Sequence, residues 1–201
     1  PRENLLAEPL PRDSMAAIGL AAAVIARRQG RDAVVGSFAA DQTIADEAAF
    51  TDAVCQAAAL ARAGWVVTIG IEATGPSTAF GYIHCGEPIE VSGDPSGRRV
   101  VAFTEKPDAA TAARYLATGD YRWNAGMFVV RAGVLLDHLA AQRPALAAGI
   151  EAIARAWDTP AREEVLAATW PGLEKIAIDH AIAEPVAAAG GVAVVPAAMG
   201  W

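Results

Sequence analysis

Cysteine and histidine are scarce in this chain of 201 residues, which contains two cysteines and three histidines. Cys55 lies in an alanine-rich stretch and Cys85 follows a histidine near a predicted turn, so the pair gives no disulfide framework. The histidines lack the mutual spacing that is typical of a metal site. These absences exclude a disulfide-stabilised scaffold and a His/Cys metal cluster, and two reduced cysteines indicate a cytoplasmic protein.

Long apolar runs and an excess of positive charge are also lacking. No apolar run reaches the length that spans a membrane, and residues 1–14 lack the charged and apolar regions of a signal peptide. The formal net charge of −7 disfavours a broad surface for nucleic acid or for an anionic membrane. We therefore expect neither a nucleic-acid nor a membrane partner. Any phosphate should be bound by a few cationic groups at one site rather than by a broad basic surface.

The composition that is present, 54% hydrophobic and 19% charged, is typical of a soluble α/β domain. Hydrophobic periodicity predicts helices over residues 13–29, 47–63, 108–118 and 134 to about 167, with breaks at Pro144 and Pro160. It predicts strands over 34–38, 65–71, 100–106 and 125–132, a last helix and strand within 176–196, and loops over 72–99 with a short hairpin around 93–97. The strand–helix–strand order predicts a mainly parallel mixed sheet, with helices on both faces and a small hairpin insertion.

A glutamate, a lysine and a proline end one apolar run, in FTEKP (103–107). Successive strand side chains point to opposite faces, so Glu105 and Lys106 can share a pocket only if the strand ends there. Pro107 favours an extended conformation at Lys106 and predicts a strand terminus at the edge where α/β sheets bind ligands. There Glu105 could accept hydrogen bonds from sugar hydroxyls and Lys106 could hold a phosphate. The alternative is a solvated ion pair of little energetic value, which spacing alone favours.

Two further segments contain residues that suit a nucleotide site. Asp41 follows an apolar strand and two alanines, which suits a ligand of Mg²⁺ carrying phosphate oxygens; a turn or helix cap is the alternative. Residues 8–14, EPLPRDS, precede a predicted helix whose N-terminus offers backbone donors, while Glu8 could accept from guanine. The alternative is that Asp13 or Ser14 only caps that helix.

Six segments in this order resemble the sugar-phosphate nucleotidyltransferases, and among them the mannose-1-phosphate guanylyltransferases: EPLPRDS, GSFAADQTI, VVTIGIEATGPSTAFGYI, VVAFTEKPD, YRWNAGMFVV and IAIDHAIAE. The resemblance spans nearly the whole chain. It implies a single α/β domain over residues 1–201 with a Rossmann-like nucleotidyltransferase fold. It also implies GTP and mannose 1-phosphate as substrates, GDP-mannose and pyrophosphate as products and Mg²⁺ as cofactor, and it allows a homodimer.

The same resemblance implies a role for each matching residue. Asp41 matches the family's metal-binding aspartate and Lys106 the ligand of the sugar phosphate, so these two would carry catalysis. The sugar and its phosphate would be contacted by Gly81, Glu105, Lys106, Asn124 and, in a supporting role, Asp179. The guanine would lie beside Glu8, Pro9, Arg12, Asp13 and Ser14.

The sequence departs from the family's pattern at four places. The family's glycine-rich triphosphate loop does not occur before the chain begins, and its second metal-binding aspartate would follow the Gly-Trp at which the chain stops. We therefore expect a domain that lacks both. Gln42 stands where the family usually has histidine, and Ala177 where serine is usual. The alternatives are a nucleotidyltransferase for another nucleotide or sugar 1-phosphate, and a non-catalytic regulator that binds a sugar nucleotide.

Overall fold

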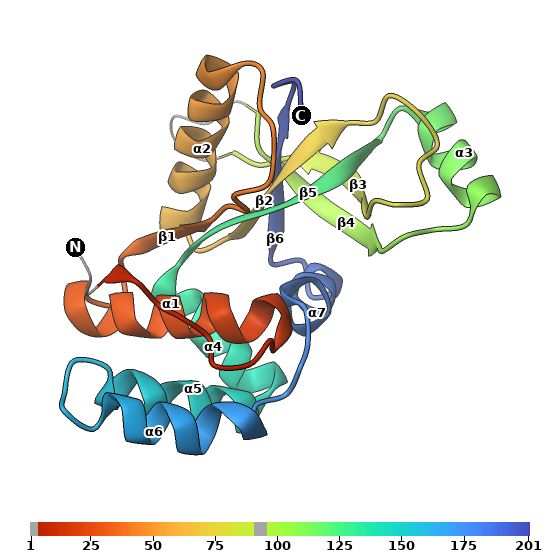
Figure 1. The fold of residues 1–201 in the computed structure, drawn as a ribbon. Helices are drawn as coiled ribbons and strands as arrows, with labels where there is room; N and C mark the ends of the chain where they lie inside the picture. The colour runs from red at the N-terminus through yellow and green to blue at the C-terminus, as the bar shows by residue number, and fades with distance from the viewer. Residues whose placement is uncertain (1–3, 91–95) are drawn as a thin grey trace. The chain divides into compact units, whose positions relative to one another are not determined.

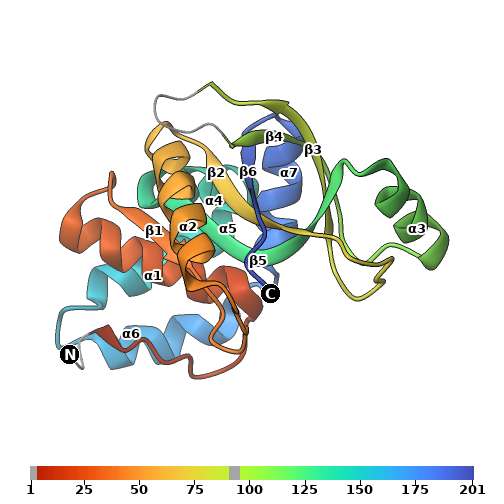
Figure 2. The same cartoon turned by 90° about the horizontal axis from the view of Figure 1, so that it is seen from above.

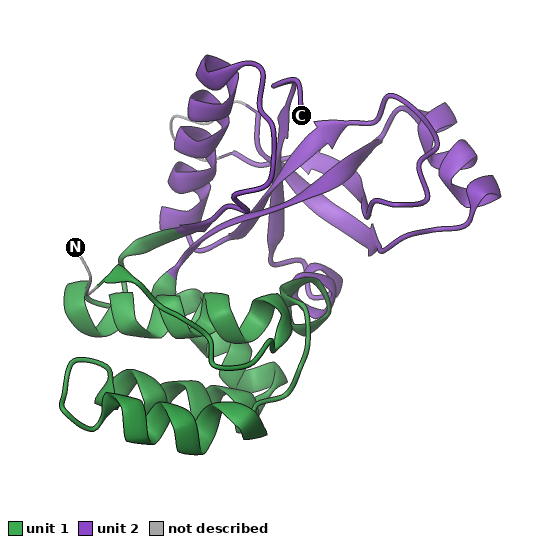
Figure 3. Ribbon diagram, viewed as in Figure 1, with its two compact units in different colours: residues 1–35, 132–182 green, residues 36–131, 183–201 purple. Residues whose placement is uncertain are grey.

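The computed structural model describes residues 4–90 and 96–201, which belong to two compact units (Figure 3). Unit 1, in green, runs up to Val35 and from Ala132 to Ile182. Unit 2, in purple, runs from Gly36 to Arg131 and from Ala183 to Trp201. Within the described residues, no helix combines the length and the apolar character that crossing a membrane requires.

Unit 1 consists mainly of helices, namely α1 (Asp13–Gln29), α4 (Ala132–Gln142), α5 (Pro144–Ala156), α6 (Arg162–Thr169) and a 3₁₀ turn at Trp170–Gly172 (Figures 1 and 2). The predicted break at Pro144 is confirmed, because α5 begins at that residue. Helix α1 packs against α4 and α5. Gly19 allows this close approach, since a Cβ atom there would lie 2.8 Å from Ile150 Cδ1.

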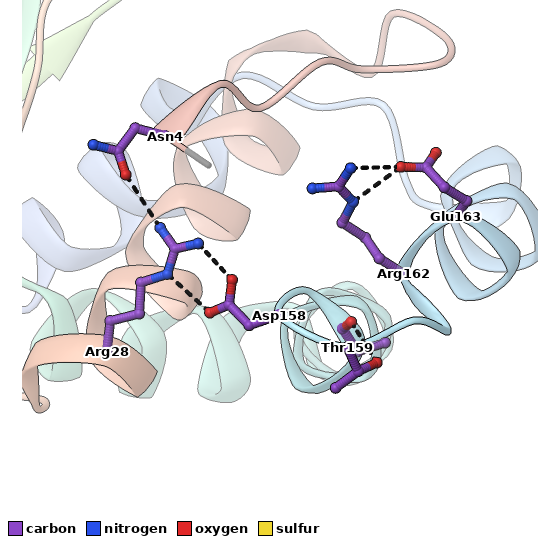
Figure 4. Close-up of polar contacts among 7 residues, drawn as sticks. Asn4, Arg28, Asp158, Thr159, Arg162 and Glu163 are labelled. Atoms are coloured by element: carbon purple, nitrogen blue, oxygen red, sulfur yellow. Dashed lines mark hydrogen bonds and ion pairs between the residues drawn. The ribbon is translucent and has the colours of Figure 1, made fainter. Parts of the chain in front are cut away.

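A pair of charges ties the end of α1 to the turn after α5 (Figure 4). Arg28 donates from Nε to Asp158 Oδ2 at 2.9 Å and from its terminal nitrogen to Oδ1 at 2.5 Å. Its other terminal nitrogen donates to Asn4 Oδ1 at 3.4 Å. Hydrogen bonding by Arg28 lowers the pKa of Asp158 below its ordinary value. A bidentate arginine–carboxylate pair fixes geometry better than a single contact does.

The start of α1 differs from the prediction. Arg12 occupies the N-cap position, and its side chain makes no capping hydrogen bond. Asp13 has a φ of 64° and accepts from the backbone N–H of the next residue, Ser14, at 2.8 Å. The Ser14 hydroxyl accepts instead from the N–H of Ile178 at 2.9 Å. The capping prediction for Asp13 or Ser14 is therefore wrong, because a backbone donor distant in sequence occupies the serine.

Unit 2 contains the sheet, whose strands are β1 (Val34–Ser37, beginning at the end of unit 1), β2 (Val66–Glu72), β3 (Tyr82–Pro88), β4 (Arg98–Thr104), β5 (Tyr121–Arg131) and β6 (Val192–Ala197) (Figure 1). Its helices are α2 (Glu47–Arg62), α3 (Ala109–Thr118) and α7 (Glu184–Ala188). The π-helical turn at Asp179–Ala183, which precedes α7 in the chain, belongs to unit 1 as far as Ile182. Helix α2 packs along β2, β5 and β6. The predicted cap of α3 is confirmed, since Asp108 Oδ1 accepts from the Thr111 N–H at 2.7 Å.

The strand order is β1-β5-β2-β6-β4-β3, and β3 also pairs with β5, so five strands close into a ring. Strands β2 and β6 run parallel. The pairs β2–β5, β3–β4, β3–β5 and β4–β6 are antiparallel. The α/β class is confirmed, but the expectation of a mainly parallel sheet is wrong. Strand β5 lies between β1 and β2, and an apolar run carries no information about strand direction.

Strand β3 lies within residues predicted to be loops. Only Tyr82 and Ile83 of this strand are fully buried, and His, Cys, Gly, Glu and Pro follow them. That composition hides the period-2 pattern on which strand prediction depends. The hairpin predicted around 93–97 falls largely on residues 91–95, which lie outside the described part of the chain.

Replacing Trp170 with phenylalanine is expected to destabilise the protein more than replacing Trp157. Both side chains are buried, but Trp170 Nε1 donates to the Leu10 carbonyl at 2.7 Å, whereas Trp157 Nε1 has no partner among the described residues. Trp170→Phe should lower the free energy of unfolding by about 0.5–1.5 kcal/mol, the net contribution of one hydrogen bond, because phenylalanine cannot donate to that carbonyl. Urea denaturation of both variants tests this, and equal losses would contradict it.

Candidate functional site

Three residues predicted to contact a sugar come together in unit 2. Strand β4 ends at Thr104, two residues before the end predicted at Lys106, and places Glu105 just beyond it. A Cβ atom on Gly81 would lie 2.6 Å from Glu105 Oε2 and 3.4 Å from Asn124 Cβ. The Asn124 N–H donates to the Gly81 carbonyl at 2.8 Å. Gly81, Glu105 and Asn124, with Lys106 beside them, form a set that we call the Glu105 cluster.

Lys106 adopts a conformation that the sequence did not predict. Its φ is 44°, in the left-handed region, so the expected extended backbone is wrong. In an extended chain, consecutive side chains diverge, whereas here Lys106 Nζ turns back to within 2.8 Å of Glu105 Oε1. The side chain of Lys106 is 63% exposed and that of Glu105 only 26%, so solvent reaches the ammonium while the carboxylate is partly shielded. A non-glycine residue in this region carries a backbone strain of about 1–2 kcal/mol.

The orientation of Asn124 is fixed by neighbouring donors. Its Oδ1 accepts from Thr68 Oγ1 at 3.1 Å and from the Gly126 N–H at 3.1 Å. Thr68 is itself fully buried in β2. These two donors identify Oδ1 as the accepting end of the amide, so the NH₂ group is its donating end.

Asp41 lies in a separate pocket of unit 2, after the end of β1. The pocket has a volume of about 440 Å³ and is lined by Asp41, Gln42, Thr43, Phe80, Trp123 and Trp201. Helix α2 is capped by Asp46, whose Oδ1 accepts from the Ala49 N–H at 2.9 Å, so Asp41 is not that cap. Asp41 is exposed and makes no hydrogen bond or ion pair with another described residue. Its carboxylate is therefore available to a ligand in the Asp41 pocket.

Aromatic rings form one wall of the Asp41 pocket. Phe80 lies 4.9 Å from Trp123 and 5.2 Å from Trp201, measured between ring centroids. Such a wall suits the apolar face of a sugar or a base. The sequence analysis missed these three residues, although two of them precede the predicted Gly81 and Asn124 directly in the chain.

Gln42 connects the Asp41 segment to β5. Its Nε2 donates to the Ala125 carbonyl at 2.7 Å, and this bond fixes which end of the amide is the donor. Gln42 Oε1 and Trp123 Nε1 are both buried without a partner among the described residues. Phe80 and Trp123 line the Asp41 pocket, and the residues that follow them, Gly81 and Asn124, belong to the Glu105 cluster. The Asp41 pocket and the Glu105 cluster are therefore neighbours along two segments of the chain.

Residues predicted to lie beside guanine are in unit 1. Glu8 and Pro9 are exposed. Arg12 donates to the carbonyls of Trp170 and Pro171, which gives it a structural task within that unit. Asp13 is also exposed, so the carboxylates of Glu8 and Asp13 are the acceptors that this segment presents.

Asp179, predicted to support sugar binding, is half-buried at the start of a π-helical turn. Such turns are rare and occur frequently at functional sites. Within residues 4–90 and 96–201, no group of three or more His, Cys, Asp or Glu side chains could hold a metal ion.

The arrangement of a carboxylate in an aromatic pocket beside a Glu–Lys–Asn cluster suits a phosphorylated sugar and a nucleotide. Residues 1–170 match the nucleotidyl transferase family, and the chain belongs to that family. The family resemblance predicted from the six motifs is thereby confirmed.

Two curated relatives match nearly the whole chain. The xanthan biosynthesis protein XanB of Xanthomonas campestris pv. campestris (strain B100) is 40% identical over 205 residues, which cover 98% of this chain and 40% of that protein. The mannose-1-phosphate guanylyltransferase of Escherichia coli (strain K12) is 38% identical over 205 residues, covering 99% of this chain and 41% of that enzyme. The chain thus spans about two fifths of the length of these relatives.

Two solved structures share the fold. The mannose-1-phosphate geranyltransferase from Thermus thermophilus superposes with a TM-score of 0.81 and 31% identity, covering 97% of this chain and 53% of that one. The mannose-6-phosphate isomerase from Helicobacter pylori gives a TM-score of 0.74 and 26% identity, covering 96% of this chain and 71% of that one.

Proposed function

We propose that this chain provides the nucleotidyl-transfer site of a mannose-1-phosphate guanylyltransferase. The reaction transfers GMP from GTP to mannose 1-phosphate and releases pyrophosphate. The observation that carries the proposal is the Glu105 cluster, in which a half-buried carboxylate lies against a glycine backbone and beside a lysine ammonium. The names of relatives about 40% identical to the chain support the choice of substrates.

In this proposal the Glu105 cluster binds the sugar phosphate. The Glu105 carboxylate accepts hydrogen bonds from neighbouring sugar hydroxyls, and the Asn124 amide donates to a sugar oxygen. Gly81 lets the sugar and Glu105 approach the backbone closely, because no side chain fills that space. The mobile ammonium of Lys106 neutralises the sugar phosphate.

The Asp41 pocket of unit 2 would hold Mg²⁺ together with phosphate oxygens of the nucleotide. Mg²⁺ usually binds one or two protein carboxylates together with phosphate oxygens and water, and the single exposed carboxylate of Asp41 fits that pattern. A bound Mg²⁺ would offset charge on the triphosphate and on the departing pyrophosphate. Within unit 1, the exposed carboxylates of Glu8 and Asp13 are the groups that suit the N1–H and amino donors of guanine.

The chemical step needs no general base from the chain. The second pKa of a phosphate monoester is about 6, so mannose 1-phosphate is largely a dianion at neutral pH. One of its oxygens attacks the α-phosphorus of GTP, the bond from that phosphorus to the bridging oxygen breaks, and pyrophosphate leaves with the electron pair. The chain's task is to hold two polyanions together and in line.

Pyrophosphate release by the complete gene product tests the proposal directly. GTP with mannose 1-phosphate should give the highest kcat/KM in a matrix of four nucleoside triphosphates and two sugar phosphates, mannose 1-phosphate and glucose 1-phosphate. Preference for another pair would assign the site to a different nucleotidyltransferase. Binding of GDP-mannose without any turnover would support the non-catalytic regulator instead.

Gly81→Ala is expected to impair use of the sugar phosphate selectively. The new methyl group would lie 2.6 Å from Glu105 Oε2, so the carboxylate has to move away from its position. KM for mannose 1-phosphate should rise by about tenfold or more, because one misplaced polar contact costs roughly 1–2 kcal/mol. KM for GTP should stay within about twofold. Gly75→Ala is the control, since nothing lies within 4 Å of a Cβ atom there; a larger change for GTP would contradict the assignment.

A further inference from the structure

A second, smaller pocket of unit 2 lies where four strands of the ring converge. It has a volume of about 110 Å³ and is lined by Cys85 of β3, Arg98 of β4, Arg122 of β5, Pro196 of β6, and Gly119 and Asp120. Gly70 of β2 leaves space for the Arg122 side chain, because a Cβ atom there would lie 2.9 Å from Arg122 Cβ. We call it the Arg98 pocket. None of its lining residues has a role in the proposed reaction.

Both arginines of the Arg98 pocket are held by backbone carbonyls. Arg98 Nε donates to the Gly86 carbonyl at 2.9 Å. One terminal nitrogen of Arg122 donates to the carbonyls of Gly119 and Tyr121 at 3.0 and 2.9 Å. These bonds orient each guanidinium without neutralising it, and they leave most of its five N–H donors for another acceptor.

Among the described residues, neither arginine of the Arg98 pocket has a carboxylate in contact with it. Arg98 and Arg122 are half-buried, and neither forms an ion pair with another described residue. By contrast, Arg28 and Arg31 each reach a carboxylate at 2.5 Å. Asp120 lines the Arg98 pocket but makes no such contact. Two partly desolvated cations that share one pocket favour an anionic ligand between them.

We propose that the Arg98 pocket binds a small tetrahedral oxyanion of the phosphate class, held between the guanidinium groups of Arg98 and Arg122. Planar guanidinium groups match phosphate oxygens with paired N–H donors. A water molecule occupies about 30 Å³ of liquid, so a pocket of about 110 Å³ has the size of an oxyanion rather than of a nucleotide. The anion could be free phosphate or the phosphate group of a larger metabolite.

The position of Arg122 gives this binding a route to the candidate active site. On β5, Arg122 is followed by Trp123, which lines the Asp41 pocket, and then by Asn124 of the Glu105 cluster. On β5, Arg122 and Trp123 pair with Glu72 and Ile71 of β2 on one side and with Ile83 and Tyr82 of β3 on the other. An anion that fixes Arg122 therefore acts on the strand that carries residues of both proposed substrate sites.

Cys85 provides a reporter that does not depend on enzymatic activity. Burial raises the pKa of its thiol and the negative charge of Asp120 adds to that rise, while the positive charges of Arg122 and Arg98 act to lower it. An anion between the arginines would cover the thiol and cancel their charge, so both effects slow its alkylation. In a Cys55→Ser background, Cys85 is the only cysteine of the chain.

The experiment follows iodoacetamide labelling of Cys85 with inorganic phosphate or with chloride at equal ionic strength. Phosphate should slow labelling by about threefold or more, in line with the lower thiolate fraction. Arg98→Gln and Arg122→Gln should each abolish that protection, while Arg27→Gln, which alters an exposed ion pair in unit 1, should keep it. Glucose 6-phosphate as a second probe distinguishes the sources: protection by phosphate alone indicates a free ion, and protection by both indicates a phosphorylated metabolite.

Calorimetric titration of the unmodified chain with phosphate covers the case in which an arginine variant does not fold. Saturable binding at millimolar phosphate that competes with labelling supports the site. Equal labelling rates in phosphate and chloride, or protection that survives both arginine substitutions, would overturn the proposal. Because neither readout measures nucleotidyl transfer, failure of the proposed function leaves this test unchanged.

Discussion

Lys106→Ala in the complete gene product is expected to lower kcat by about 10²–10³-fold, the range measured when one preorganised charge-stabilising group is removed. KM for mannose 1-phosphate should rise more than KM for GTP, since the ammonium lies beside Glu105 of the proposed sugar site. The Lys106 side chain is 63% exposed, so its loss should affect the stability of the fold much less than it affects kcat. Steady-state kinetics with each substrate varied in turn measures both effects.

Three further variants separate charge from backbone conformation at this position. Lys106→Arg should retain part of the activity because it keeps the charge. Lys106→Gly should be as inactive as the alanine variant but more stable than it by about 1 kcal/mol, since glycine adopts a φ of 44° without strain. Lys175→Ala removes the chain's other lysine, which is exposed in unit 1, and should leave kinetics unchanged. Unchanged kinetics in Lys106→Ala would remove this residue from the mechanism.

Short sequence motifs that resemble the family were enough to select residues that lie close together in the structure. FTEKP, TAFGYI and WNAGMF are separate in the chain, yet Glu105, Gly81 and Asn124 form one cluster. The end of β4 followed from Pro107 and the charged pair before it. What the motifs could not supply was the turn at Lys106. Its positive φ occurs together with the contact to Glu105, whereas the local preference of a residue before proline is for an extended backbone.

The sheet shows a similar limit at larger scale. Apolar runs located β1, β2, β4, β5 and β6, because burial of a continuous run is a local signal. Closure of the ring through β3 and β5 depends on cross-strand pairing between residues about 40 positions apart, such as Tyr82 with Trp123. The aromatic wall of the Asp41 pocket likewise requires Phe80, Trp123 and Trp201 to meet, which no spacing in the sequence indicates.

Asp41→Asn is expected to remove the response of the enzyme to Mg²⁺. The substitution keeps the size of the side chain but replaces a carboxylate with a neutral amide, a much weaker ligand for a hard cation. Turnover should fall by about 10²-fold or more and should no longer rise as Mg²⁺ increases from about 0.1 to 10 mM, since the lost charge stabilisation is of the kind worth several kcal/mol. Pyrophosphate release at saturating GTP and mannose 1-phosphate measures both changes.

Asp46→Asn is the matched control. It makes the same chemical change five residues after Asp41, at a residue that caps helix α2. Asparagine caps helices about as well as aspartate, so this variant should keep both the stability of α2 and the normal Mg²⁺ response. Mn²⁺ binding in the presence of GTP, followed by water-proton relaxation, adds a readout that does not require turnover. A normal metal response in Asp41→Asn would refute the assignment, since Asp41 is the only carboxylate lining the pocket in the described part of the chain.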